Sequence, residues 1–218
     1  MLQKTALVIG GTGLVGSELI KILLADDRFA TVKLFGRRTT GLHHPKLQEH
    51  VINFDEPGDW QHLVAGDVAF SALGTTLKTA GSKKAQYKVD YTYQYEFAKA
   101  AAKNDVAVYV LVSSAMANEH SRLFYTRIKG ELERDIKQLP FQSIHIMQPG
   151  MLVGARPESR TGEQVGIKII RFLNSIGIAK KQKPIDAAKV AQAMVNVSFK
   201  TSCKINVYSL LDVFAAAQ

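Results

Sequence analysis

The chain has 218 residues, of which 46% are apolar and 22% are charged, and its formal net charge is +9. These values are ordinary for a globular protein, so they exclude a disordered or fibrous chain and favour one domain with a well-buried core. The lysines and arginines are scattered without a long basic arm, which argues against nucleic acid as the main partner.

In chain order, short apolar segments alternate with helical patterns. Strands between helices imply right-handed crossovers and an open parallel sheet. The sequence therefore predicts an α/β fold, a doubly wound parallel sheet of the Rossmann type, in a single domain over residues 1–218. We expect a strand over 5–9, a helix over 17–25, strands over 31–35, 51–54 and 68–73, a helix over 85–104, a strand over 107–112, a helix over 125–139, a strand over 143–147, a helix over 186–198 and a strand over 204–210.

The segment 151–184 departs from this alternation because it carries several charges and an amphipathic piece, residues 167–178. In a doubly wound sheet, ligands bind beyond the carboxyl ends of the strands, where a segment that follows the sixth strand can reach them. We therefore expect 151–184 to be a small C-terminal segment that covers the substrate. For the amphipathic piece itself, core packing is the default interpretation, and the alternatives are a substrate lid, an interface with a protein partner or a second copy, and a membrane-surface helix.

The start of the chain and its cysteine content bear on location. The first residues, 1–4, lead straight into an apolar strand without the features of a secretory signal. No stretch approaches the ~18 uncharged apolar residues of a membrane-spanning helix. The single cysteine, Cys203, cannot form an internal disulfide, which fits a reducing compartment. We therefore predict a cytoplasmic protein without a transmembrane segment.

Closely spaced glycines follow the first predicted strand, in the stretch VIGGTGLVGSEL. They read as Gly10-x-x-Gly13-x-x-Gly16 or, starting from Gly11, as Gly-x-Gly-x-x-Gly. Between a strand and a helix, such glycines permit a tight turn, the approach of a pyrophosphate and close packing of the helix. The phosphates then lie at the positive end of the helix. This placement favours a dinucleotide-binding turn over a plain structural bend.

The end of the second predicted strand bears on which dinucleotide binds. An acidic residue ~20 positions past the glycines binds the ribose of NAD, whereas an arginine accommodates the 2′-phosphate of NADP. Here the strand runs into LFGRRT, with Arg37 and Arg38 and no acidic residue alongside. A guanidinium forks onto phosphate oxygens, which a carboxylate repels. We therefore predict NADP(H), with a solvated basic turn as the alternative.

A tyrosine and a lysine follow the fifth predicted strand at helical spacing. Tyr125 and Lys129 share one face of a helix, and Ser113 and Ser114 lie where the strand ends. A tyrosine with its ordinary pKa of ~10 is a poor base at neutral pH, and lowering that pKa by three units needs ~4 kcal/mol. An ammonium ~5 Å away supplies ~3 kcal/mol of this. The pair is therefore a candidate proton-transfer site.

The glycine turn, the serines and the Tyr-x-x-x-Lys pair, in this order, resemble the short-chain dehydrogenase/reductase superfamily. The stretches SALGTT, FYTRIKGELE and QPGMLVGARPESRTGE are similar to its atypical branch, that of the human Tat-interacting, metastasis-suppressor-type NADPH-binding oxidoreductase and its bacterial relatives. The similarity covers nearly the whole chain. Two positions differ from the pattern of many relatives: Asp90 stands in place of an asparagine, and Gln148 stands in place of an arginine.

The resemblance implies roles for the cofactor-binding residues. The phosphate turn would comprise Gly10, Thr12, Gly13, Leu14 and Val15, with Gly16 packing behind it. Arg37 and Arg38 would bind the 2′-phosphate, and Asp55, at the end of the third strand, would face the adenine. Leu73, Gly74 and Thr75 would line the adenosine, and Pro149, Gly150 and Met151 would run along the nicotinamide.

The resemblance also implies catalytic roles. Ser114, with Ser113 as the alternative, would hold a substrate carbonyl, Tyr125 would exchange the proton, and Lys129 would bind the nicotinamide ribose and lower the pKa of Tyr125. The expected function is NADPH-dependent reduction of a small carbonyl or related substrate. Asp90 and the short substrate segment motivate an alternative, a non-catalytic NADP(H)-binding module that reports redox state to a protein partner. No histidine or cysteine spacing suggests a metal site.

Overall fold

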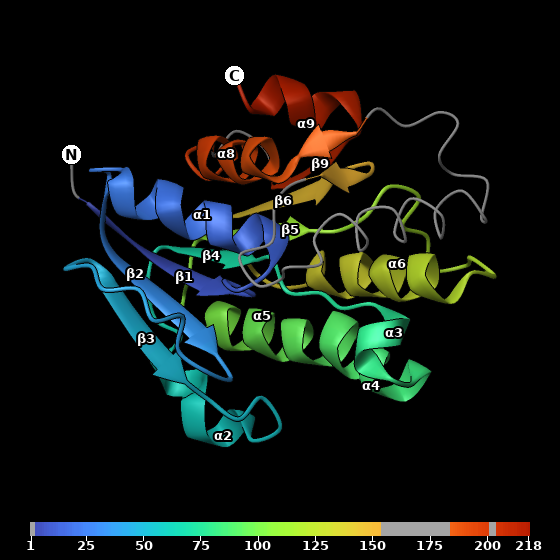
Figure 1. Ribbon diagram of the computed structural model, residues 1–218, viewed down its shortest axis with the longest axis horizontal. Coiled ribbons are helices and arrows are strands. Elements are labelled where there is room, and N and C mark those ends of the chain that lie inside the picture. The colour runs from blue at the N-terminus through green and yellow to red at the C-terminus, as the bar shows by residue number, and fades with distance from the viewer. Residues whose placement is uncertain (1–2, 154–183, 201–203) are drawn as a thin grey trace.

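The computed structural model describes residues 3–153, 184–200 and 204–218, and its centre is a seven-stranded sheet with helices on both faces (Figure 1). The strand order is β3-β2-β1-β4-β5-β6-β9, and every neighbouring pair is parallel. The doubly wound sheet predicted from the sequence is therefore present. Its strands are β1 (Lys4–Ile9), β2 (Phe29–Gly36), β3 (Leu47–Val51), β4 (Val68–Ser71), β5 (Val108–Val112), β6 (Ser143–Gln148) and β9 (Ile205–Ser209).

Two groups of helices cover the two faces of the sheet (Figure 1). On one face lie α1 (Leu14–Ala25), α8 (Ala187–Val197) and α9 (Leu211–Ala216), and on the other lie α2 (Pro57–Trp60), α5 (Tyr93–Lys103) and α6 (Phe124–Ile136). Side chains of β1 alternate between the two cores: Val8 belongs to the α1 side, and Leu7 and Ile9 belong to the α5 side. Both faces of this strand are buried, which explains its continuous apolar sequence.

Short elements complete the described chain. A 3-10 turn, η1 (Gln61–Leu63), follows α2, and two short helices, α3 (Leu77–Ala80) and α4 (Lys83–Tyr87), follow β4. A π-helical turn, η2 (Lys88–Thr92), joins α4 to α5. The strands β7 (Leu152–Val153) and β8 (Ile185–Asp186) form a separate parallel pair. Cys203 and most of the predicted substrate-covering segment 151–184 lie outside the described residues.

Two predicted elements differ from the observed ones. The third strand was expected over 51–54, but β3 ends at Val51 because it is a half-exposed edge strand with a polar, alternating sequence. The helix expected over 85–104 is interrupted by η2, where the chain turns Asp90 inward. A π-helical turn inside a helix often marks a functional site.

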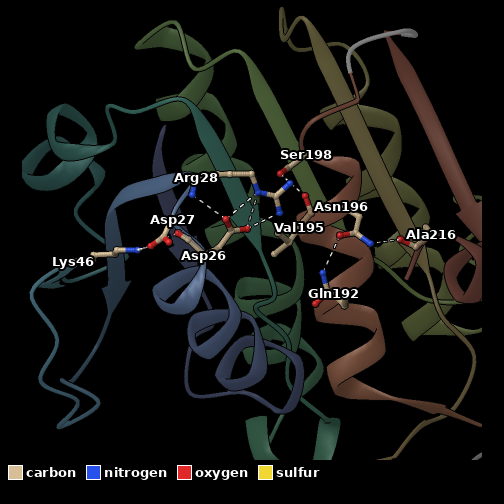
Figure 2. A network of polar contacts seen from close by, with 9 residues as sticks. All are labelled: Asp26, Asp27, Arg28, Lys46, Gln192, Val195, Asn196, Ser198 and Ala216. Atoms are coloured by element: carbon tan, nitrogen blue, oxygen red, sulfur yellow. Dashed lines mark hydrogen bonds and ion pairs between the residues drawn. The ribbon is translucent and has the colours of Figure 1, made fainter. Parts of the chain in front are cut away.

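A polar network joins α1 and α8 at the end of the molecule opposite the glycine turn (Figure 2). Arg28 donates to Asp26 at 2.6 Å and lies 4.0 Å from the ring centroid of Phe199. Asn196, on α8, donates to the backbone of Ala216 on α9 at 3.0 Å. These charged and amide groups therefore serve packing between the helices of one face.

Candidate functional site

Four segments meet beyond the carboxyl ends of the central strands. Along the chain, strand order reverses between β1 and β4, which lie side by side with Ile9 opposite Ser71. Beyond β5, the backbone N–H of Ser113 donates to Met147, and that of Ala115 donates to Pro149. The loops after β1, β4, β5 and β6 are thereby fixed at one edge of the sheet. In this fold class, such an edge is where ligands bind.

The glycine turn after β1 is shaped by close backbone contacts. Gly10 has a φ of +81°, and a Cβ there would lie 2.4 Å from backbone atoms of Ala72 and Leu73. A Cβ on Gly16 would lie 2.1 Å from the carbonyl oxygen of Gly10, whereas one on Gly13 would lie 3.2 Å from the same atom. Gly10 and Gly16 are therefore required by the turn itself. This is the geometry expected of the Gly10-x-x-Gly13-x-x-Gly16 pattern.

The first turn of α1 offers free backbone donors. The helix begins at Leu14, and its N-cap, Gly13, supplies no side-chain hydrogen bond. The N–H groups of Leu14, Val15 and Gly16 have no acceptor within the helix. No acidic residue lies in this first turn, and Thr12 is exposed beside it. An uncapped, positive helix end next to a glycine cradle fits a pyrophosphate.

Arg37 and Arg38 lie in the bend after β2, and both are exposed. Arg37 has no polar partner among the described residues. Asp55 lies in the turn beyond β3, not at the end of the strand as expected. Its carboxylate pairs with Lys88 at 2.6 Å and accepts from the Tyr93 hydroxyl at 2.9 Å, and these contacts hold the pKa of Asp55 below its usual range.

The segment after β4 is fastened to Asp90. The backbone N–H of Thr75 donates to Asp90 Oδ1 at 3.1 Å, and a Cβ on Gly74 would lie 3.2 Å from the same oxygen. Asp90 is fully buried in η2. Together with Leu73, this segment passes directly over the glycine turn, because the backbone of Leu73 contacts Gly10. Thus the predicted adenosine segment and the phosphate turn are adjacent.

Ser114 and Tyr125 come together across two elements. Tyr125 lies in the first turn of α6, and the Ser114 side chain in the loop after β5 is near enough to its hydroxyl to lower the pKa of Tyr125. Burial and the nearby Asp90 raise the pKa of Tyr125 above its ordinary value, and Ser114 opposes this effect. Tyr125 is therefore protonated at neutral pH in this structure.

Lys129 lies one helical turn beyond Tyr125 and is almost fully buried. Its Nζ is 3.8 Å from Asp90 Oδ1. Burial lowers the pKa of Lys129, whereas Asp90 and Glu133 raise it. The role expected for Lys129, lowering the pKa of Tyr125, stays a prediction, and in this structure burial and Asp90 act in the opposite direction. The carboxylates around Lys129 offset its charge.

Glu133 is a buried residue that the sequence analysis missed. Its carboxylate accepts a hydrogen bond from the Ser113 hydroxyl. The Gln148 amide donates to both carboxylate oxygens, at 2.9 Å and 3.1 Å, and Lys137 Nζ lies 3.5 Å away. These bonds tie the ends of β5 and β6 to α6. The spacing of Lys129, Glu133 and Lys137, four residues apart on one helix face, is the signal that could have revealed it.

The segment that follows Gln148 crosses the same edge of the sheet. Pro149 accepts a hydrogen bond from Ala115, and Met151 accepts one from Ile185 at 2.9 Å, with Gly150 between them. In the part of the chain that the structure describes, no group of three histidine, cysteine or acidic side chains could hold a metal ion. No helix within the described ranges is long and apolar enough to cross a membrane.

Sequence comparisons identify related proteins over most of the chain. The family model described as NAD(P)H-binding matches residues 10–200. Protein FMP52-1, mitochondrial, of Scheffersomyces stipitis is 34% identical over 200 residues, which cover 89% of this chain and 88% of the relative. Protein fmp52, mitochondrial, of Aspergillus fumigatus is 36% identical over 207 residues, which cover 88% and 86% of the two chains.

Solved structures with a similar fold include nucleotide-bound enzymes. The Bordetella bronchiseptica enzyme WbmH in complex with NAD+ has a TM-score of 0.73 and 16% identity, over 95% of this chain and 76% of that one. The UDP-glucose 4-epimerase of Thermotoga maritima with UDP-glucose has a TM-score of 0.70 and 13% identity, over 94% and 76%. These likenesses confirm the Rossmann-type fold. They also agree with the resemblance to short-chain dehydrogenases/reductases.

The predicted cytoplasmic location is contradicted by the relatives. The proteins from Scheffersomyces stipitis, Candida albicans and Aspergillus fumigatus are all named as mitochondrial. The prediction was wrong because a missing secretory signal bears on secretion alone and says nothing about delivery to an organelle.

Proposed function

Because this chain belongs to the NAD(P)H-binding family, we propose that it is an NADPH-dependent oxidoreductase that reduces a small carbonyl or related substrate. Tyr125 donates the proton, and Ser114 orients the substrate oxygen. The observation that carries this proposal is the proximity of the Ser114 and Tyr125 side chains, at the same edge of the sheet as the uncapped start of α1. A proton donor and a dinucleotide cradle at one edge suit hydride transfer.

The proposed cofactor site follows the loops in order. The pyrophosphate takes the free N–H groups at the start of α1, with Gly10 and Gly13 leaving room for its approach. Leu73, Gly74 and Thr75 line the adenosine side, and Pro149, Gly150 and Met151 line the nicotinamide side. Lys129 and Tyr125 reach the nicotinamide ribose. When bound, the reduced cofactor supplies a hydride.

The proposed preference for NADPH rests on the bend after β2. Arg37 is exposed and has no polar partner in the described chain, so its guanidinium is available to a phosphate. Arg38 lies beside it. Asp55 is the acidic residue predicted for the adenine side, and its carboxylate is already paired with Lys88 and Tyr93. Its charge is thereby largely compensated and repels a 2′-phosphate only weakly.

The protonation state of Tyr125 supports reduction as the favoured direction. A carbonyl oxygen that becomes an alkoxide as its carbon gains hydride needs a proton donor within hydrogen-bond reach. Tyr125 is neutral at pH 7 already at the ordinary tyrosine pKa of about 10, and burial and Asp90 raise that pKa further. Ser114 can hold the same oxygen, since its hydroxyl is within hydrogen-bonding reach of the Tyr125 hydroxyl. The two hydroxyls thus define where a substrate oxygen fits.

The experiment that tests this function follows NADPH and NADH consumption by the purified chain with a panel of aldehydes, ketones and quinones. We expect oxidation of NADPH with at least one carbonyl, formation of an equal amount of reduced product, and slower turnover with NADH. An absence of turnover across the panel, with NADPH nevertheless bound, contradicts the reductase.

A second candidate is a non-catalytic module that binds NADP(H) and reports its redox state to a protein partner. The observation that favours it is the compensation of Lys129 by Asp90 and Glu133, which removes the charge that would activate Tyr125. This candidate predicts no turnover and a difference in partner affinity between the NADPH and NADP+ forms. The carbonyl panel therefore separates the two functions.

A further inference from the structure

Asp90 and Lys129 form a buried ion pair beneath Tyr125. Their side chains are 1% and 3% exposed, and Lys129 Nζ lies 3.8 Å from Asp90 Oδ1. The second carboxylate oxygen, Asp90 Oδ2, is buried and has no hydrogen-bond partner in the described chain. The pair is shielded from water, so its net charge acts strongly on neighbouring groups.

The number of protons on the pair decides that net charge. A carboxyl group and an amine that share one proton are neutral together, whichever atom holds the proton. Burial favours this sharing because it raises the pKa of Asp90 and lowers the pKa of Lys129. With an amide at position 90, only Glu133 would remain to offset the charge of Lys129 beside Tyr125.

The described residues place few other charges around the pair. Among them, Asp90 has Lys129 as its charged neighbour and uncharged donors besides, and Tyr125 has Asp90 and the Ser114 hydroxyl. Glu133 also acts on Lys129, but its carboxylate is bound by other groups. The facing groups are the Thr75 N–H from the β4 loop, Gln86 from α4, Asp90 from η2, Ser114 from the β5 loop, and Lys129 and Glu133 from α6.

We propose that Asp90 cancels the charge of Lys129 and thereby keeps Tyr125 protonated, which makes the site a proton donor for reduction rather than a base for alcohol oxidation. This inference rests on the proposed function, in which Tyr125 exchanges the proton. Asp90 touches neither substrate nor cofactor in this scheme. It is a positioning residue whose charge acts on Tyr125 directly and also offsets the charge of Lys129.

The two directions of the reaction place opposite demands on Tyr125. In reduction, the carbonyl carbon gains a hydride from the reduced nicotinamide, which is oxidised, and the carbonyl oxygen gains the tyrosine proton. In oxidation, a tyrosinate must first be present to remove the hydroxyl proton as hydride leaves the carbon. A tyrosine that stays protonated at neutral pH supports the first reaction and suppresses the second.

The test is a pH titration of Tyr125 by NMR, in the full-length protein labelled with ζ-13C-tyrosine, with and without NADP+. The chain has seven tyrosines, so the Tyr125 signal is identified by its loss in Tyr125→Phe. In the unaltered protein we expect Tyr125 to stay protonated beyond about pH 10, the ordinary pKa of tyrosine. In Asp90→Asn, which keeps an acceptor for Thr75, we expect the midpoint to fall by at least about one pH unit.

Glu96→Gln is the matched control because it removes a carboxylate from the same run of helix, where Glu96 pairs with Lys99 at the surface. Its Tyr125 midpoint should stay that of the unaltered protein. An unchanged midpoint in Asp90→Asn contradicts the proposal. If Asp90→Asn does not fold, Asp90→Ser, which also removes the carboxylate and leaves Lys129 in place, decides: a midpoint at least about one pH unit lower supports the proposal, and a smaller change contradicts it.

The titration needs no substrate, so it tests the role of Asp90 independently of the reductase activity. A protein that reduces no carbonyl but shows the expected shift refutes the reductase and leaves the role of Asp90 standing. If the protein reduces carbonyls but the Tyr125 midpoint is unchanged in Asp90→Asn, the reductase function stands and the proposed role of Asp90 is refuted.

Discussion

Replacing Tyr125 with phenylalanine is expected to lower the rate of carbonyl reduction by at least about a hundredfold, the contribution of a positioned proton donor. The substitution removes one hydroxyl and leaves the ring in the first turn of α6. Affinity for NADPH should change little, because the phosphates and adenosine bind elsewhere along the edge. Steady-state rates with NADPH and calorimetric titration of NADPH measure the two quantities.

Tyr95→Phe is the matched control for this substitution. Tyr95 lies on α5, where its ring stacks on Tyr91, and it is half-buried like Tyr125. It should retain the full rate. Undiminished turnover in Tyr125→Phe removes Tyr125 as the proton donor, and an equal loss in both variants points to a change in folding instead.

Replacing Gly16 with alanine is expected to destabilise the fold and to abolish tight NADPH binding. The new Cβ would lie 2.1 Å from the carbonyl oxygen of Gly10, so α1 must move away from the turn. We expect the free energy of unfolding to fall by about 1–3 kcal/mol, as for overpacked sites. NADPH affinity should fall at least about a hundredfold, because misplaced N–H groups lose charge-assisted hydrogen bonds.

Gly58→Ala provides the control for Gly16→Ala. A Cβ on Gly58 meets nothing within 4 Å, and the residue lies in α2. Denaturant unfolding should show equal or slightly higher stability than the unaltered chain, since alanine favours helix over glycine. A Gly16→Ala protein that is as stable as this control and binds NADPH normally would show that the close contact is not needed.

Much of the fold was predictable because its strands are buried on both faces. The apolar runs at β1, β4 and β5 can only lie inside a covered sheet, and helical spacing between them implies parallel order. The bounds of β3 were mispredicted because a strand at the edge of the sheet can carry polar residues, here Gln48, Glu49 and His50. The C-terminal helix α9 was missed because six residues give too little periodicity to recognise.

The candidate site was predictable where residues act through local spacing. The glycine turn and the Tyr125–Lys129 pair each lie within one short stretch, so their geometry follows from strand, turn and helix. The partners of Lys129 come from other elements, since Asp90 lies in η2 and the contacts of Glu133 reach β5 and β6. A Coulomb interaction calculated for Lys129 alone therefore leaves out burial and Asp90, which raise the pKa of Tyr125. Charge compensation across elements requires the tertiary structure.

The most direct measurement is a crystal structure of the full-length protein with NADPH. We expect the pyrophosphate against the N–H groups of Leu14, Val15 and Gly16 and the 2′-phosphate against Arg37. The nicotinamide should face Ser114 and Tyr125 across an open pocket. A pyrophosphate bound elsewhere, or side chains filling the space between the nicotinamide and Tyr125, would contradict a reductase built on this edge of the sheet.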